Sequence, residues 1–194
     1  TDKWWPLRPL RPLLVGFERA VVRRATVVLP VCEDLAVKVR PWTAADRVVV
    51  LPDVPVGDGP VTGSVDALRD SAGGDAVIGL YVGNLEHYQG IDLLLDALTR
   101  LHPDTRFHMI VVGGSDADIA GYRQKSEHMG IASRVKFIGR RPVAHLGAYL
   151  AQADILVSPR TLGDNTPMKV YSYMQSGKAI LATDIRSHTQ ALDA

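Results

Sequence analysis

The stretch AVIGLYVGNLEHYQGIDLLLDALTRLHPDTRFHMIVVGG, residues 76–114, decides the fold. It opens with a near-continuous apolar run at 76–83 and closes with a second one at 106–114. Between them, residues 90–102 carry apolar side chains at helical spacing. Continuous apolar runs are typical of strands buried on both faces, and a helical connection between two such strands makes them parallel. The stretch therefore predicts a strand–helix–strand unit of a parallel sheet.

The same alternation continues to the end of the chain. Further apolar strands are predicted at 135–140, 154–159 and 179–184, with intervening helices at 116–130, 143–153 and 166–177. Right-handed crossovers place such helices on both faces of the sheet. We predict an α/β fold with a doubly wound, parallel, Rossmann-like sheet.

The first part of the chain has a different pattern. Prolines interrupt the first twelve residues, and the pattern then predicts a helix at 12–24, a buried strand at 26–31, a helix at 32–40 and another strand at 47–53. The Pro- and Gly-rich residues that follow favour a linker. We predict three segments: 1–54 as the partial end of a preceding α/β domain, 55–74 as a linker, and 75–194 as a truncated second domain.

Composition narrows the class of protein. The 194 residues are 46% hydrophobic and 22% charged, which is typical of a globular protein, and the net charge of +1 argues against a nucleic-acid partner. A single cysteine, Cys32, excludes an intrachain disulfide and favours a reducing, cytoplasmic compartment. No apolar run approaches the roughly 20 residues of a membrane-spanning helix. Trp4, Trp5 and the basic residues before Ala25 have two interpretations: peripheral contact with a membrane surface, or packing against a missing domain.

Ligands of such sheets bind outside the carboxyl ends of the strands. Three loops are expected there, at 81–90, 111–118 and 158–169. In the third, Thr166 is predicted as the N-cap of the next helix and Pro167 as its first residue. Free N–H groups at this helix start, together with the charge of Lys169, favour an anion.

Helical spacing sorts the side chains of this helix. Pro167, Val170, Tyr171 and Met174 are predicted to face the core, whereas Lys169, Ser172 and Tyr173 are predicted to face the cleft. Asp164 in the loop could accept hydrogen bonds from sugar hydroxyls. A plain alternative stays open, in which the residues at 164–166 only terminate and cap a helix while Lys169 is solvated.

The segment NTPMKVYSYMQSGKAILATDI (165–185) resembles the donor-binding segment of the group 1 glycosyltransferases, a large retaining family with the GT-B fold. YVGNLEHYQGIDLLLDAL (81–98) and VKFIGRRPVAHLGAYLAQADI (135–155) are similar to other blocks of that family. The resemblance covers about 75–194 and, more weakly, 18–54. It implies the C-terminal half of a GT-B architecture.

The resemblance also implies an activity: transfer of a sugar from a nucleotide-diphosphate donor to a hydroxyl acceptor, with retention and without an essential metal or other cofactor. The implied partners are the nucleotide sugar, a glycan or lipid-linked acceptor, and a missing N-terminal domain that holds the acceptor groups. The chain alone is therefore expected to be inactive.

This sequence departs from the family pattern at charged positions. The two family glutamates fall on Asp164 and Ser172, and the Arg and Lys that clamp the diphosphate fall on Asn84 and Gln89. Lys169, with Arg160 or Arg140, is expected to replace the lost cations. Asp164 is the predicted catalytic residue. The predicted donor-binding residues are Gly83, Asn84, Gln89, Arg140, Arg160, Asn165, Thr166, Pro167, Met168, Lys169 and Ser172.

Two other functions stay open: a non-catalytic subunit that binds a sugar nucleotide, and a GT-B epimerase of sugar nucleotides. Asp116 and Asp118 form an Asp-x-Asp pair, which holds a metal ion in another glycosyltransferase architecture. Asp116 as a helix cap and Asp118 in the first turn explain the pair without a metal, so no metal site is predicted.

Overall fold

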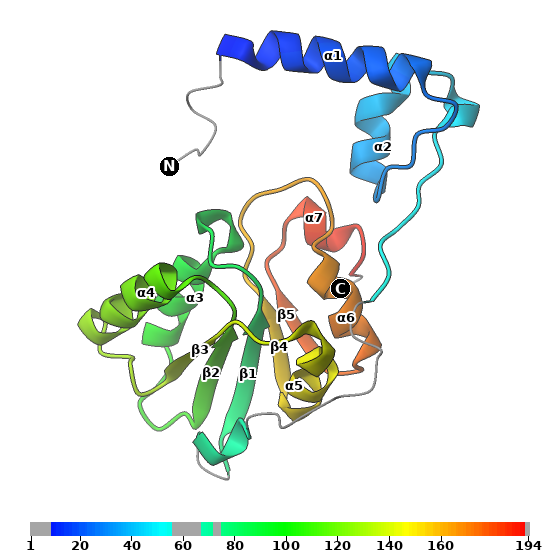
Figure 1. Cartoon of the computed structure of the whole chain (residues 1–194). Coiled ribbons are helices and arrows are strands. Elements are labelled where there is room, and N and C mark those ends of the chain that lie inside the picture. Colours follow the sequence, from blue (N-terminus) through cyan, green and yellow to red (C-terminus); the bar gives the residue numbers. More distant parts are fainter. Residues whose placement is uncertain (1–8, 56–66, 72–74, 193–194) are drawn as a thin grey trace.

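The structure is a computed structural model of the chain, and it describes residues 9–55, 67–71 and 75–192. Its centre is a five-stranded, fully parallel sheet with the order β3-β2-β1-β4-β5 (Figure 1). The strands are β1 (Val77–Val82), β2 (Phe107–Val112), β3 (Val135–Gly139), β4 (Ile155–Ser158) and β5 (Ala179–Ala182). The predicted α/β, Rossmann-like fold is confirmed.

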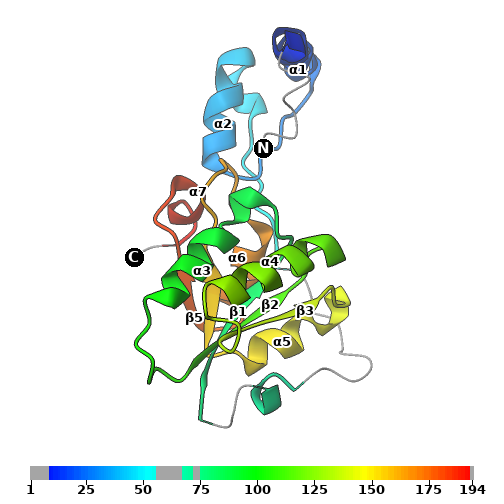
Figure 2. The same ribbon diagram turned by 90° about the vertical axis from the view of Figure 1, so that its left-hand side faces the viewer.

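Helices cover both faces of this sheet, as Figures 1 and 2 show. They are α3 (Ile91–Thr99), α4 (Asp116–His128), α5 (Leu146–Gln152), α6 (Met168–Gln175) and the short α7 (Arg186–Thr189). Residues of α3 and α4 pack in one apolar cluster with Tyr81 of β1, while α5 and α6 pack in a second cluster with Leu80. Neighbouring residues of one strand point to opposite faces, so β1 has to be apolar throughout.

The N-terminal part consists of α1 (Arg11–Arg24), α2 (Glu33–Val39) and short 3₁₀ turns at Arg40–Trp42 and Ala45–Arg47. Both predicted helices are confirmed, but the predicted buried strands at 26–31 and 47–53 are wrong. The two segments share one isolated parallel bridge, Val28 to Val48, and most of their side chains are exposed or half-buried. Within the described part of the chain these two segments pair with each other alone, and a pair this short buries too little apolar surface to form a stable sheet.

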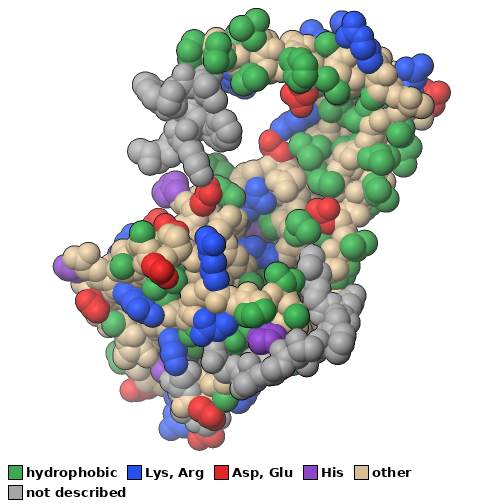
Figure 3. Space-filling model, viewed as in Figure 1, with side chains coloured by type: hydrophobic (Ala, Val, Ile, Leu, Met, Phe, Trp, Pro, Cys, Tyr) green, Lys and Arg blue, Asp and Glu red, His purple; other side chains and the backbone are tan. Residues whose placement is uncertain are grey.

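Helix α1 projects away from the sheet (Figure 1). Its hydrophobic side chains lie on the surface in Figure 3, and Leu13 and Phe17 are each 72% exposed. Trp4 and Trp5 lie outside the described residues, so the membrane contact stays a prediction. Among the helices of the described ranges, none has the length and hydropathy needed to cross a membrane.

Most of the predicted linker, 55–74, lies outside the described residues. The described piece, residues 67–71, packs on the sheet: Leu68 is 2% exposed within the second apolar cluster, and Arg69 forms an ion pair with Asp154 at 2.6 Å. These contacts begin the packed unit a few residues before the predicted boundary at 75.

Candidate functional site

The candidate site lies at the point where the strand order of the parallel sheet reverses, between β1 and β4. β1 and β4 are neighbours, but the crossover from β1 leads to β2 on one side and the strand after β4 is β5 on the other. The loops that follow β1 and β4 therefore lead to opposite sides from the carboxyl ends of these strands, which face α2 (Figure 1). Open α/β sheets bind ligands at this place.

The two loops contact each other directly. The N–H of Thr161 donates to the carbonyl of Tyr88 at 2.9 Å. Gly90 adopts φ 74°, and a Cβ atom on it would lie 1.8 Å from the carbonyl oxygen of Pro159. Only glycine fits here, because both the left-handed conformation and the close approach disfavour a side chain.

Lys169, in the first turn of α6, reaches across to the loop after β1. Its Nζ lies 3.0 Å from Oε1 of Gln89 and 3.9 Å from the centroid of the Tyr81 ring. A Cβ atom on Gly83 would lie 2.9 Å from the same Nζ, so the backbone passes close to the ammonium group. The structure thus brings together three predicted site residues: Gly83, Gln89 and Lys169.

The pKa of Lys169 is well below that of a lysine in water. Burial, with a smaller contribution from the nearby positive charge of Arg160, lowers the pKa of Lys169 from 10.5 to about 7. Among the described residues, its partners are an amide oxygen and an aromatic face, and no carboxylate neutralises it. An anion that arrives beside it would restore the charged form.

The start of α6 differs from the prediction by one residue. Pro167 is the N-cap and Met168 is the first helical residue, so the predicted roles of Thr166 as N-cap and Pro167 as first residue are wrong. Pro167 has extended backbone angles (φ −64°, ψ 130°), and the N–H of Val170 already donates to its carbonyl at 2.9 Å. Thr166 is 1% exposed, and its Oγ1 has no hydrogen-bond partner among the residues that the structure describes.

The faces of α6 are also partly different from the prediction. Tyr173 is fully buried, and its hydroxyl accepts a hydrogen bond from the N–H of Val82 at 3.0 Å, while Met174 is exposed. Ser172 is 3% exposed. The buried positions of α6 include Val170 and Tyr173, and a spacing of i, i+3 from Val170 would have identified this pair.

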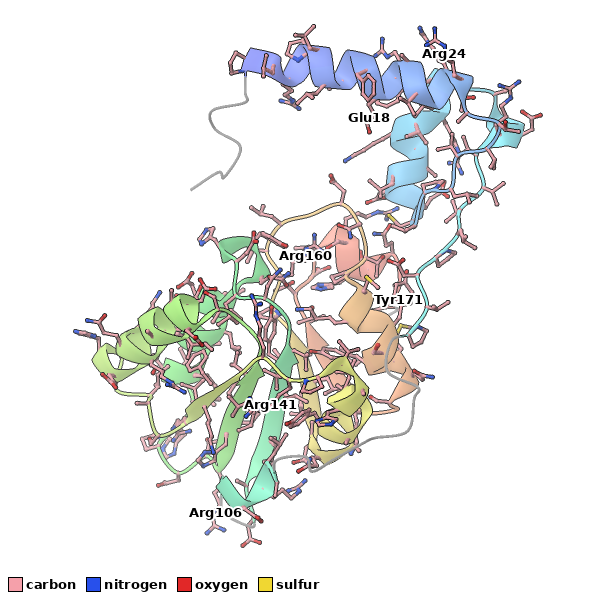
Figure 4. The ribbon with its side chains drawn as sticks, in the orientation of Figure 1. Glu18, Arg24, Arg106, Arg141, Arg160 and Tyr171 are labelled. Carbon is pink, nitrogen blue, oxygen red and sulfur yellow. The ribbon has the colours of Figure 1, made fainter. Side chains whose placement is uncertain are left out.

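Arg160 organises the loop after β4, at the strand edge that faces α2 (Figure 4). Its guanidinium donates to the carbonyl of Leu162 (2.6 Å) and to the carbonyl and Oδ1 of Asn165 (3.1 and 3.2 Å). It also lies 5.4 Å from the centroid of the Tyr88 ring. Loop atoms already accept hydrogen bonds from the guanidinium N–H groups, and Arg160 is only 8% exposed. Its predicted contact with a nucleotide sugar therefore stays a prediction.

Asp164, the predicted catalytic residue, lies on the side of this loop that faces α2. Its exposed carboxylate forms an ion pair with Lys38, and its carbonyl accepts hydrogen bonds from Cys32 Sγ (3.6 Å) and Gln190 Nε2 (3.0 Å). These contacts do not include the group around Lys169. The N-terminal segment therefore reaches the candidate site, which the linear sequence did not indicate.

The remaining predicted residues lie around the rim. Asn84 is exposed, and its carbonyl accepts a 2.6 Å hydrogen bond from the Tyr81 hydroxyl. Met168 is 52% exposed. Arg140 donates to the carbonyl of Gly114 at 3.1 Å and lines a hollow of about 480 Å³ at the ends of β2 and β3. A second hollow, of about 500 Å³, lies beside Arg106 at the opposite sheet edge, far from these loops (Figure 4).

The Asp-x-Asp pair lies in the first turn of α4, and Asp118 takes part in a capping box. Ser115, and not Asp116, is the N-cap: its Oγ accepts from the N–H of Asp118 at 3.2 Å, and the Asp118 carboxylate accepts from the N–H and Oγ of Ser115. This capping box lowers the pKa of Asp118. Within the described ranges, no three His, Cys, Asp or Glu residues are grouped as metal ligands.

Sequence reasoning missed three residues that build the site. Tyr81 forms the floor beneath Lys169; its position two residues before Gly83 on the same strand face could have indicated it. Ser158 and His188 form a buried 2.9 Å hydrogen bond at the end of β4, and the other His188 ring nitrogen lies 2.9 Å from the carbonyl of Thr183. No sequence signal links positions 158 and 188, because the pair forms only when β4 and α7 are adjacent.

Comparison with known proteins places this geometry in a family. A family model described as "Glycosyl transferases group 1" matches residues 76–193. The D-inositol 3-phosphate glycosyltransferase of Corynebacterium glutamicum (strain R) is 27% identical over 111 residues, which are 54% of this chain and 26% of that protein. The phosphatidyl-myo-inositol mannosyltransferase of Mycobacterium tuberculosis (strain CDC 1551 / Oshkosh) is 26% identical over 117 residues, which are 58% and 29% of the two chains.

Solved structures give the same fold. Anabaena HepE in complex with UDP and glucose aligns with a TM-score of 0.77 at 18% identity, over 93% of this chain and 50% of HepE. WaaG, a glycosyltransferase involved in lipopolysaccharide biosynthesis, aligns with a TM-score of 0.74 at 19% identity, over 97% of this chain and 53% of WaaG. The chain thus spans less than a third of these curated relatives and about half of these solved chains. It belongs to the group 1 glycosyltransferases.

Proposed function

We propose that this chain binds the diphosphate of a nucleotide sugar and forms the donor half of an enzyme that transfers the sugar, with retention, to a hydroxyl acceptor. One observation carries the proposal: the half-buried ammonium of Lys169, held between the Tyr81 ring and the Gln89 amide at the start of α6. A desolvated cation without a carboxylate partner, at a helix start and a sheet switch point, suits an anionic ligand.

The substitutions in the first loop fit this arrangement. Gln89 stands where the family has a cation, and its Oε1 now accepts a hydrogen bond from Lys169. One cation from α6 thus takes the place of cations from the loop. Each charge-assisted hydrogen bond to the diphosphate contributes about 1.5–3 kcal/mol, so the exchange retains affinity only if Lys169 is charged in the complex.

The proposed chemistry depends on the leaving diphosphate. Lys169 and the free N–H groups at the start of α6 would stabilise the negative charge that develops as the sugar–phosphate bond breaks. Asp164 would accept hydrogen bonds from the sugar hydroxyls, and the hollow beside Arg140 would receive the nucleoside. The acceptor, a glycan or lipid-linked hydroxyl compound, would come from a second domain, with the reaction on the cytoplasmic side of a membrane.

A second candidate is a non-catalytic subunit that binds the sugar nucleotide. The specific observation in its favour is Ser172, which is 3% exposed and uncharged at the position of the second family glutamate. In this case the full-length protein would bind the sugar nucleotide but would not transfer its sugar.

Calorimetric titration tests the proposed function. The chain should bind one pair among UDP and UDP-glucose, GDP and GDP-mannose, or ADP and ADP-glucose, and EDTA should leave the affinity unchanged. Absence of heat with all six compounds, for a chain whose thermal unfolding is cooperative, would overturn the proposal. Release of free nucleoside diphosphate by the full-length protein separates the transferase from the non-catalytic subunit.

Binding should also depend on pH, because it requires protonated Lys169. Since the pKa of Lys169 in the free chain is about 7, we expect the affinity for the sugar nucleotide to be highest below pH 7. It should fall by up to about tenfold per pH unit as the pH rises above 7. Sugar nucleotides suit this measurement, because their diphosphate does not titrate in this range.

The same coupling predicts proton uptake on binding. At pH 7.5 the binding enthalpy should vary between phosphate and Tris buffers in proportion to their ionisation enthalpies. The Lys169→Met variant is the matched control and should show neither effect. A wild-type affinity that stays constant from pH 6 to 9 would contradict the role of this ammonium.

A further inference from the structure

Both ends of helix α2 contact the second part of the chain, at the loop after β4 and at α7. At its N-terminal end, Arg186 of α7 donates to the Asp34 carboxylate at 3.0 Å, and Cys32 Sγ approaches the Asp164 carbonyl at 3.6 Å. At its C-terminal end, Lys38 Nζ forms an ion pair with Oδ2 of Asp164. Three contacts thus join a helix from the N-terminal part to the loop after β4 and to α7.

Asp164 receives its orientation from two separate sources. The loop fixes its backbone: Arg160 packs so closely under Gly163 that a Cβ there would lie 1.9 Å from the guanidinium, and Gln190 Nε2 donates to the Asp164 carbonyl at 3.0 Å. The side chain itself is 63% exposed, and its contact within the described part of the chain is Lys38 on Oδ2. Oδ1 accepts no hydrogen bond from the described residues.

We infer that Lys38 is a positioning residue: it holds Oδ2 of Asp164 so that Oδ1 is presented to the hydroxyl groups of the donor sugar. This inference rests on the proposed function, because it requires that the donor sugar lies beside the loop after β4. An aspartate at the surface would otherwise sample several rotamers, and ordering such a side chain on binding costs affinity. Lys38 orders it in advance.

The ion pair alone contributes little to folding, since exposed pairs typically contribute about 0.2–1 kcal/mol. Its effect should therefore be found in ligand discrimination and not in stability. A nucleoside diphosphate without a sugar lacks the hydroxyl groups that Asp164 would bind. The sugar nucleotide should consequently depend on Lys38, and the nucleoside diphosphate should not.

The test uses the nucleoside diphosphate and the matching sugar nucleotide that bind the chain in the six-compound titration. We expect Lys38→Ala to weaken binding of the sugar nucleotide by about three- to fivefold, the upper part of the range for a single exposed charge contact, and to leave the nucleoside diphosphate affinity unchanged. Lys38→Arg should restore the wild-type ratio of the two affinities. Arg106→Ala is the matched control, because it breaks an exposed ion pair with Asp75 (3.3 Å) at the opposite sheet edge.

Other outcomes overturn the inference in distinct ways. Equal losses for both ligands would indicate a general charge effect, and tighter binding of the sugar nucleotide would indicate that Lys38 blocks Asp164. Equal wild-type affinities for the two ligands would show that a contact between Asp164 and the sugar adds nothing to the affinity. If none of the six compounds binds the wild-type chain, the proposed function itself is wrong.

Discussion

Replacement of Lys169 with methionine should weaken binding of the nucleotide sugar by about 10- to 150-fold, the loss of one charge-assisted hydrogen bond of about 1.5–3 kcal/mol. Methionine retains an unbranched, apolar side chain over the Tyr81 ring and removes the charge. The variant should fold normally, because the half-buried ammonium loses hydration in the folded chain, as its lowered pKa indicates. Isothermal titration at pH 6.5 measures the effect.

Lys136→Met is the matched control for this experiment. Lys136 is an exposed lysine in β3, so the same substitution there removes one positive charge far from α6. Its affinity should stay within about twofold of the wild type, the scale of a screened surface charge. If both variants lose affinity equally, the effect reflects net charge, and Lys169 does not hold the diphosphate.

The second large effect concerns Gly90, at which the two loops of the site meet. Gly90→Ala should lower the free energy of unfolding by about 3 kcal/mol, the sum of left-handed strain and overpacking. The new Cβ would lie 1.8 Å from the carbonyl oxygen of Pro159, at a residue with φ 74°. Part of the strain should be relieved by separation of the loops, so nucleotide-sugar affinity should fall as well.

Urea denaturation followed by circular dichroism measures this change. Gly121→Ala provides the control, because Gly121 lies within α4 and a Cβ there meets no atom within 4 Å. Alanine at an exposed helical position should stabilise the chain by about 0.5–1 kcal/mol. Equal stability of Gly90→Ala and the wild type would contradict the close approach of the two loops.

Part of the candidate site could be predicted because it depends on local chemistry. Gly83 and Lys169 were found from loop position and charge at the carboxyl ends of strands, which a parallel sheet gathers on one edge. The contact between Lys169 and Gln89 could not be predicted, since it joins the first turn of α6 to the segment after β1, 80 positions earlier in the chain. The environment that lowers the Lys169 pKa arises from burial, and burial is a property of the packed chain.

Errors in the prediction have the same origin. The apolar runs at 26–31 and 47–53 have the composition of strands, yet a strand also needs neighbours, and these segments share one bridge. The face of α6 was assigned from spacing alone, but Tyr173 packs in the apolar cluster with Leu80, where the N–H of Val82 satisfies its hydroxyl. Propensity and spacing are properties of a single segment, whereas strand pairing and the burial of Tyr173 each depend on contacts between two segments.

By itself, the sequence determined the parallel α/β sheet, the succession of its strands and helices, and the edge at which a ligand would bind. These features follow from apolar periodicity and chain connectivity, which are local along the chain. Only the tertiary structure decided that Lys169 is partly desolvated over Tyr81 and that Asp164 meets Lys38 of α2. Those contacts join distant segments, and their energies depend on burial and distance, which no linear pattern contains.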